Sequence, residues 1–156
     1  MQKIKTLLIF LAIIAFFGGL IYLFVSQRGK NQALQQRAAV ELFDPYLDLL
    51  KQSKFADAYQ NFTNQEYKKK FSANEFDQNY QKQITDKGAI DKYEIYSVEE
   101  KDMFGENKNA EATIRIYFSN KSSQSVRYVI QNDDSGKYKI VTSVRSSGST
   151  YLAEAW

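Results

Sequence analysis

Residues 110–118 read AEATIRIYF, and every second side chain in this stretch is apolar. A period of two is typical of a strand that has one buried face and one face exposed to water. The apolar positions are Ala110, Ala112, Ile114, Ile116 and Phe118. Because one face of such a strand has to be buried, the sequence predicts a sheet that other elements cover on one side.

Three further stretches, 93–98, 126–130 and 138–144, read as neighbouring strands of an antiparallel meander. We predict that Phe118 lies opposite Val126, with a loop at 121–123, and that Ile130 lies opposite Tyr138, with a loop at 133–135. Residues 93–98 carry apolar side chains in two phases, which indicates a bulge or burial on both faces.

Before residue 89 the apolar side chains recur every three or four positions, which indicates helices. Asp44-Pro45 predicts a kink or a new start, because proline has no N–H for the helical ladder. Residues 63–66 (TNQE) and 72–75 (SANE) both match the capping box, so we expect a helix to begin after Thr63 and another after Ser72. The second of these helices should end at Gly88.

This order of elements resembles the nuclear transport factor 2-like superfamily, specifically its small bacterial cell-envelope members. The resemblance rests on residues 46–83, which read YLDLLKQSKFADAYQNFTNQEYKKKFSANEFDQNYQKQ, and on the hairpins that follow Gly88. It implies an α+β fold, a cone of short helices packed on a curved antiparallel sheet. It carries over no catalytic residue, because no enzyme motif of the superfamily is matched.

Residues 4–25 read IKTLLIFLAIIAFFGGLIYLFV, a run that is long and apolar enough for a transmembrane helix. We expect a signal anchor at 1–26, a helical juxtamembrane linker at 27–43, the α+β domain at 44–145 and a flexible tail at 146–156. Bulky residues where a signal peptidase needs small ones favour a retained anchor. The layout favours a single-pass protein of the inner membrane with its domain in the periplasm or outside the cell.

The chain has no histidine and no cysteine, which excludes cysteine–histidine and serine–histidine catalysis and the usual zinc ligand sets. We therefore assign no catalytic residue, no cofactor and no metal ligand. A formal net charge of +3 does not indicate a nucleic-acid partner. Some carboxylates could in principle serve acid–base chemistry, but their spacing marks no pair and a solvated surface explains them: Asp57, Asp77, Asp91, Glu94 and Asp102.

Three groups of residues are candidates for binding. The predicted register places six outward residues of the sheet in two rows, which form a candidate partner face: Arg115, Tyr117, Arg127, Val129, Lys139 and Val141. Strand propensity alone also explains these residues. A cavity between sheet and helices would be lined by Tyr80, Tyr96 and Tyr128. Ala15, Gly18 and Gly19 have the spacing that lets a second membrane helix approach closely.

These features lead to three hypotheses for function. The first is a non-enzymatic, membrane-anchored scaffold or accessory subunit. Its residues 4–25 contact the bilayer, and its domain binds other envelope or membrane proteins or a second copy of the chain. The second is a small-molecule-binding or sensory domain that uses the concave cavity, and a cavity filled by side chains would count against it. The third is a carboxylate-dependent hydrolase or isomerase, which requires two facing acids in a pocket.

Overall fold

The computed structural model describes residues 15–19, 22, 26, 28–100, 109–146 and 154–155, and its contacts divide the chain into two compact units, 1–33 and 34–156. In the second unit, α-helical residues 34–38 precede the π-helix η1 (Ala39–Phe43). The helices α2 (Asp44–Lys51), α3 (Phe55–Phe62), α4 (Gln65–Lys70) and α5 (Ala73–Lys87) come next. The strands β1 (Ile90–Glu100), β2 (Asn109–Phe118), β3 (Ser123–Asn132), β4 (Tyr138–Ser146) and β5 (Glu154–Ala155) follow. This unit is therefore an α+β fold.

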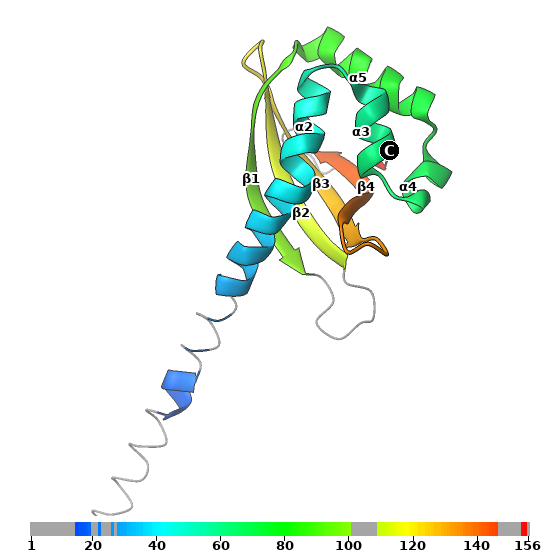
Figure 1. Ribbon diagram of the computed structural model, residues 1–156. Coiled ribbons are helices and arrows are strands. Elements are labelled where there is room, and N and C mark those ends of the chain that lie inside the picture. The colour runs from blue at the N-terminus through cyan, green and yellow to red at the C-terminus, as the bar shows by residue number, and fades with distance from the viewer. Residues whose placement is uncertain are drawn as a thin grey trace, which may run out of the picture. The chain divides into compact units, whose positions relative to one another are not determined.

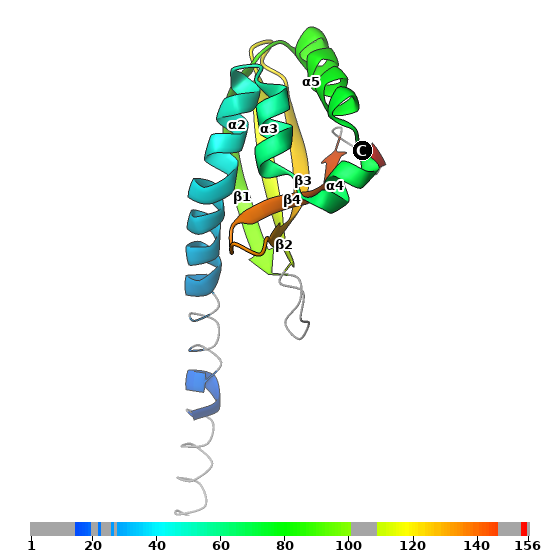
Figure 2. The ribbon, with the colours of Figure 1, turned by 45° about the vertical axis from the view of Figure 1, so that its right-hand side comes forward.

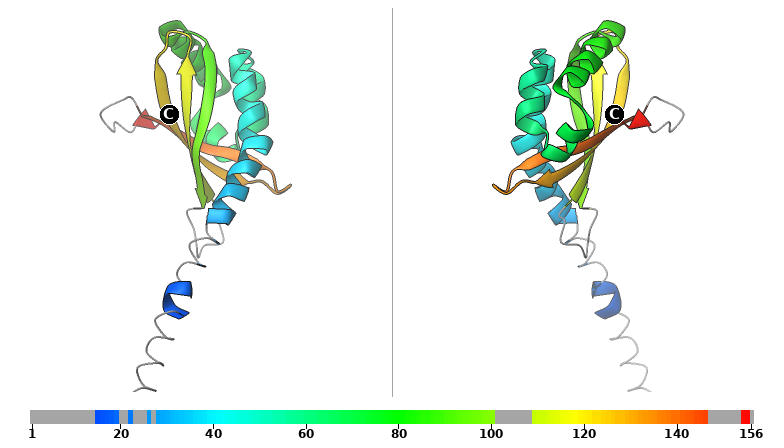
Figure 3. Two further views of the ribbon diagram at one scale, coloured as in Figure 1. Left: turned by 90° about the vertical axis from the view of Figure 1, so that its left-hand side faces the viewer. Right: turned by 90° about the vertical axis from the view of Figure 1, so that its right-hand side faces the viewer.

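The strands form one antiparallel sheet in the order β1-β2-β3-β4-β5, so each strand pairs with the next along the chain (Figure 1). Helices α2 and α3 run side by side along one face of this sheet (Figure 2). Seen edge-on, no described helix of this unit covers the other face (Figure 3). The alternation in residues 110–118 is confirmed, because its five apolar side chains are all buried.

The core lies between the helices and the sheet. From η1 and α2 it receives a stripe of buried side chains at helical spacing, including Leu42, Phe43, Tyr46, Leu47 and Leu50. Burying side chains of this size gives each about 1.5–3 kcal/mol of favourable transfer free energy. The stripe therefore fixes which side of the helical segment faces the sheet.

Pro45 does not break the helix but changes its winding just before α2. The Asp44 N–H donates to Ala39 O, five residues back, which is the hydrogen bond of a π-helix. Proline cannot donate to the carbonyl four residues before it, and a wider turn accommodates that missing bond. The chain thus continues from η1 into α2 without a separate cap.

The two predicted helix starts have different outcomes. The capping box at Ser72 is confirmed, because Ser72 Oγ accepts from the Glu75 N–H (3.3 Å) while Glu75 Oε2 accepts from the Ser72 N–H (2.7 Å). The box at Thr63 is wrong by one residue. Asn64 caps α4 by accepting from the Tyr67 N–H (2.8 Å), whereas the Thr63 hydroxyl donates to Tyr59 O at the end of α3 (2.6 Å).

The first hairpin turns two residues earlier in the chain than predicted. Phe118 donates its N–H to Ser122 O (2.9 Å), and Val126 lies opposite Ile114 instead of Phe118. Lys121 makes the tight turn with a φ of 69°. The predicted and observed partners of Val126 are an even number of residues apart, so the same side chains of β2 and β3 remain on the buried face.

The second hairpin also differs from the prediction. Ile130 lies opposite Ile140 instead of Tyr138, and a register shift separates this pair from the pairing of Val129 with Thr142. The turn is held by Asp133, whose Oδ1 accepts from the backbone N–H of Ser135 and of Lys137. This side-chain bonding pattern is typical of an Asx turn, and it selects a register that strand alternation alone does not fix.

The predicted fold class is wrong in its membrane part. Among the residues that the structure describes, no helix is both long enough and apolar enough to cross a membrane. This finding contradicts the predicted transmembrane signal anchor and the inner-membrane location derived from it. The remainder of the stretch 4–25 lies outside the described residues.

Gly88 is the position where the fold most requires glycine. It ends α5 at a φ of 85° and a ψ of −179°, a region that other residues scarcely enter, and a Cβ there would overlap Ser119 Oγ. Gly136 also has a positive φ (78°), but no heavy atom lies within 4 Å of its Cβ position.

We expect Gly88→Ala to lower the free energy of unfolding by about 2–3 kcal/mol and Gly136→Ala by about 1 kcal/mol. Urea unfolding measures both, and equal losses would contradict the clash.

Candidate functional site

The interior between helices and sheet is filled by aromatic side chains. The hydroxyl groups of Tyr46 and Tyr80 are hydrogen-bonded at 3.0 Å, which joins α2 to α5. The ring centres of Tyr46 and Tyr128 lie 6.0 Å apart in an edge-to-face arrangement, and Phe55 stacks on Tyr80 at 5.7 Å. These rings occupy the space in which the sequence placed a cavity.

The remaining space there is very small. A pocket lined by Tyr67, Phe76, Tyr80 and Arg145 has a volume of about 10 Å³, which is room for one water molecule at most. The Arg145 guanidinium lies 5.0 Å from the centre of the Tyr80 ring. Within the described residues, this interior therefore offers no site for a small organic ligand.

The buried tyrosines are poor candidates for acid–base chemistry. Burial raises the pKa of Tyr46 and of Tyr128 well above the usual value of about 10, and the neighbouring Tyr80 raises both further. Burial also raises the pKa of Tyr67. These hydroxyls are therefore neutral at physiological pH, and they serve the core.

The candidate cavity residues are not brought together. Tyr80 and Tyr128 are buried in the core, but Tyr96 is 52% exposed. Tyr96 falls at a register shift in β1, between the pairing of Ile95 with Ile114 and that of Ser97 with Thr113. The two phases of apolar residues in 93–98 had indicated a bulge, and this bulge turns Tyr96 away from the core.

Outward side chains of β1 and β2 form a connected polar and aromatic surface, which we call the β1–β2 face: Lys92, Glu94, Tyr96, Arg115 and Tyr117. The Tyr117 hydroxyl donates to Glu94 Oε2 (2.8 Å), and Lys92 Nζ lies 3.0 Å from Glu94 Oε1. The same ammonium group lies 4.5 Å from the centre of the Tyr117 ring. The Arg115 guanidinium lies 4.9 Å from the centre of the Tyr96 ring.

Hydrogen bonding on this face keeps Glu94 ionised. The Tyr117 hydroxyl and Lys92 lower the pKa of the Glu94 carboxyl, and the bond to Glu94 raises the pKa of Tyr117 to about 12. A carboxylate held in its charged form is not a general acid at neutral pH. Glu94 therefore presents a negative charge on this face, held between Lys92 and the Tyr117 hydroxyl.

The six residues of the predicted partner face do not lie in the two rows expected. Arg127 lies opposite Thr113 and Val144, and its Nε forms an ion pair with Glu111 Oε1 (2.9 Å), so it is not beside Tyr117. Val129 lies opposite Glu111 and Thr142.

Two members of the predicted set are engaged elsewhere. Lys139 Nζ donates to Asn61 O at the end of α3, and Val141, at the register shift in β4, is 9% exposed. Sequence reasoning missed Lys92, and it named Glu94 only among the candidate carboxylates and not as part of a binding face. The register between β1 and β2 would have identified both residues, because it places Lys92 opposite Tyr117 and Glu94 opposite Arg115.

The other candidate carboxylates do not converge on a pocket. Asp57 and Asp91 are exposed, on α3 and β1, and Asp77 accepts from its neighbour Gln81 on α5 (2.9 Å). Asp102 lies outside the described residues. Among the described residues, no group of three or more carboxylates could hold a metal ion.

Ala15, Gly18 and Gly19 fall on the described helical residues of the first unit. All three are exposed, and no heavy atom lies within 4 Å of the Cβ position of either glycine. We had expected these residues to pack against a second membrane helix, and that expectation depended on the transmembrane helix that the structure contradicts.

No protein-family model matches this chain, and no curated protein matches it. The resemblance to the nuclear transport factor 2-like superfamily therefore stays a prediction. Function has to be argued from the geometry of the fold and its surfaces.

The raised pKa values of the buried tyrosines predict a loss of stability in alkali. A hydroxyl whose pKa is higher in the folded than in the unfolded chain contributes full stability below about pH 10 and loses it as the pH rises toward the folded-state pKa. Tyr128→Phe removes one such group, whose hydroxyl makes no hydrogen bond within the described residues. We expect this variant to unfold at a higher pH than the parent.

The exposed Tyr96 supplies the matched control, because Tyr96→Phe removes a hydroxyl outside the core. Circular dichroism and tyrosinate absorbance, followed together against pH, measure the midpoint of alkaline unfolding. An unchanged midpoint in Tyr128→Phe, or an equal shift in Tyr96→Phe, would contradict the proposed burial of these hydroxyls.

Proposed function

We propose that this chain is a non-enzymatic protein-binding domain that contacts another protein through the β1–β2 face. The observation that carries the proposal is Tyr96, a large aromatic side chain that is 52% exposed beside the Arg115 guanidinium. Tyrosine and arginine are the side chains that most often anchor protein interfaces. No described helix of this unit covers this face of the sheet (Figure 3).

The contacts within the face support a binding role. Arg115 is oriented by the Tyr96 ring, and Glu94 is held by both Tyr117 and Lys92. Side chains that are already ordered lose less rotamer freedom when a partner covers them. Charges that are already paired with each other also lower the cost of removing water from the surface.

The filled interior favours this function over the alternatives. A pocket of about 10 Å³ between the helices and the sheet gives no support to a small-molecule sensor. The carboxylates Asp57 and Asp91 are exposed on different elements, and Asp77 accepts from Gln81, so these residues give no support to a carboxylate hydrolase. The order of helices and strands is consistent with membership of the nuclear transport factor 2-like superfamily, which we propose on that pattern alone.

Site-specific photo-crosslinking in the native host tests the proposal. A photoreactive amino acid at position 96 should give a discrete crosslinked protein, identified by mass spectrometry. The same amino acid at Lys82, an exposed position on α5, serves as the control and should not give that product.

A charge reversal sharpens the test. Arg115→Glu removes the cation beside Tyr96 and places a second carboxylate next to Glu94, so we expect the product at position 96 to fall at least about tenfold. Circular dichroism establishes that the variant is folded. Equal yields from positions 82 and 96, or a product that Arg115→Glu leaves unchanged, would reject the β1–β2 face as the interface.

A further inference from the structure

A second surface lies where the turn between β3 and β4 approaches η1, α2 and the end of α3. It is an open groove with a volume of about 710 Å³, and its lining includes Arg37, Pro45, Phe62, Lys137, Tyr138 and Lys139. This volume falls within the usual range of ligand sites. The partly exposed Phe62 and Pro45 supply apolar surface, and the cationic groups come from the segment before η1 and from the hairpin.

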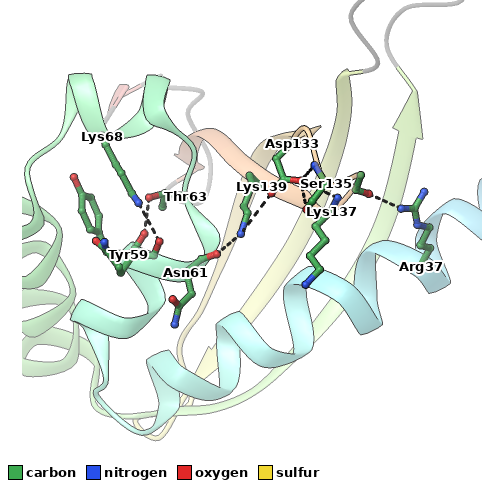
Figure 4. Close-up of polar contacts among 11 residues, drawn as sticks. Arg37, Tyr59, Asn61, Thr63, Lys68, Asp133, Ser135, Lys137 and Lys139 are labelled. Atoms are coloured by element: carbon green, nitrogen blue, oxygen red, sulfur yellow. Dashed lines mark hydrogen bonds and ion pairs between the residues drawn. The ribbon is translucent and has the colours of Figure 1, made fainter.

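The groove is held in shape by contacts between its walls (Figure 4). The Arg37 guanidinium donates to Gly136 O (2.7 Å), pairs with Glu41 (2.9 Å) and lies 4.9 Å from the centre of the Tyr138 ring. On the other side, Lys139 Nζ donates to Asn61 O. The hairpin is thus tied to the helical segment before η1 and to α3.

The charge of the groove is positive. Arg37, Lys137 and Lys139 line it, and Glu41 is the one carboxylate among its described lining residues. Glu41 already neutralises Arg37, but the Lys137 ammonium makes no hydrogen bond or ion pair within the part of the chain that the structure describes. Lys137 is therefore available to bind an anionic group.

The neighbouring groove on the other side of Lys139 has the opposite character. It has a volume of about 440 Å³, and its lining includes the carboxylates Glu66, Asp133 and Asp134 together with the cations Lys68 and Lys139. An acidic ligand is therefore favoured in one groove and disfavoured in the next. This polarity gives the larger groove charge selectivity.

The backbone of the turn argues against a site for free phosphate. The N–H groups of Ser135, Gly136 and Lys137 all donate to oxygens of Asp133, at 2.8–3.0 Å. They are therefore not available to cradle a phosphate, as the backbone of a phosphate-binding loop does. Lys139 Nζ already donates to Asn61 O and lies 3.9 Å from Asp133 Oδ2, so Lys137 supplies the ammonium group that can pair with a new carboxylate. One such ammonium group beside apolar side chains suits a carboxylate on an extended peptide.

We propose that this groove binds an acidic peptide segment of another protein. A carboxylate of the peptide pairs with Lys137, and its apolar atoms pack on Pro45 and Phe62, which are both partly exposed. This site is separate from the β1–β2 face and does not depend on the function proposed for that face.

Fluorescence anisotropy with a labelled peptide of alternating glutamate and phenylalanine tests the proposal on the full chain. We expect saturable binding that weakens as salt rises, and we expect Lys137→Glu to weaken it about tenfold. Lys121→Glu, the same change at the turn between β2 and β3, is the matched control and should leave the affinity unchanged. Circular dichroism and the urea midpoint establish that both variants are folded.

Several results would overturn the proposal. Equal losses in Lys121→Glu and Lys137→Glu would show that the peptide responds to net charge alone. Displacement of the peptide by an equimolar amount of inorganic tripolyphosphate would show a phosphate site instead. Arg115→Glu should leave peptide binding intact, so a failure of this groove and a failure of the β1–β2 face are distinguishable.

Discussion

The hydrogen bond between the hydroxyl groups of Tyr46 and Tyr80 is the contact on which the arrangement of the helices depends, because it joins α2 to α5 under the sheet. Both hydroxyls need a partner there, since a buried polar group without one costs about 1–3 kcal/mol. Each finds it in the other. Around this pair the rings of Phe55 and Tyr128 pack closely, and the buried face of the sheet closes over them.

This packing also decides where the protein can bind other molecules. Rings that fill the interior stabilise the fold and remove the cavity that a ligand would need. Binding is then left to surfaces outside the core. On the β1–β2 face, Tyr96 and Arg115 contact each other. In the groove beside the turn between β3 and β4, Lys137 lies near the apolar side chains of Pro45 and Phe62. We propose that both surfaces bind protein partners, one through an aromatic anchor and one through charge.

The sequence predicts the features that local chemistry determines. The alternation in 110–118, the capping box at Ser72 and the helix end at Gly88 each follow from a few neighbouring residues, and each is found in the structure. The hairpin registers were missed because a left-handed Lys121 and the Asp133 turn are not visible in strand periodicity. Tyr96 was misplaced because a bulge reverses the face that alternation assigns. The predicted membrane span rested on the length and apolar character of residues 4–25, and the described helices do not support it.

The account's central claim is that a partner protein covers the uncovered face of the sheet while the interior stays closed. Hydroxyl-radical footprinting of the chain, with and without the partner that crosslinking identifies, tests this most directly because it reports the exposure of individual side chains. The account predicts that oxidation of Tyr96 and Tyr117 falls in the complex while Tyr80 and Tyr128 stay protected in both states. Unchanged oxidation of Tyr96 in the complex, or access to Tyr80 in the free chain, would contradict it.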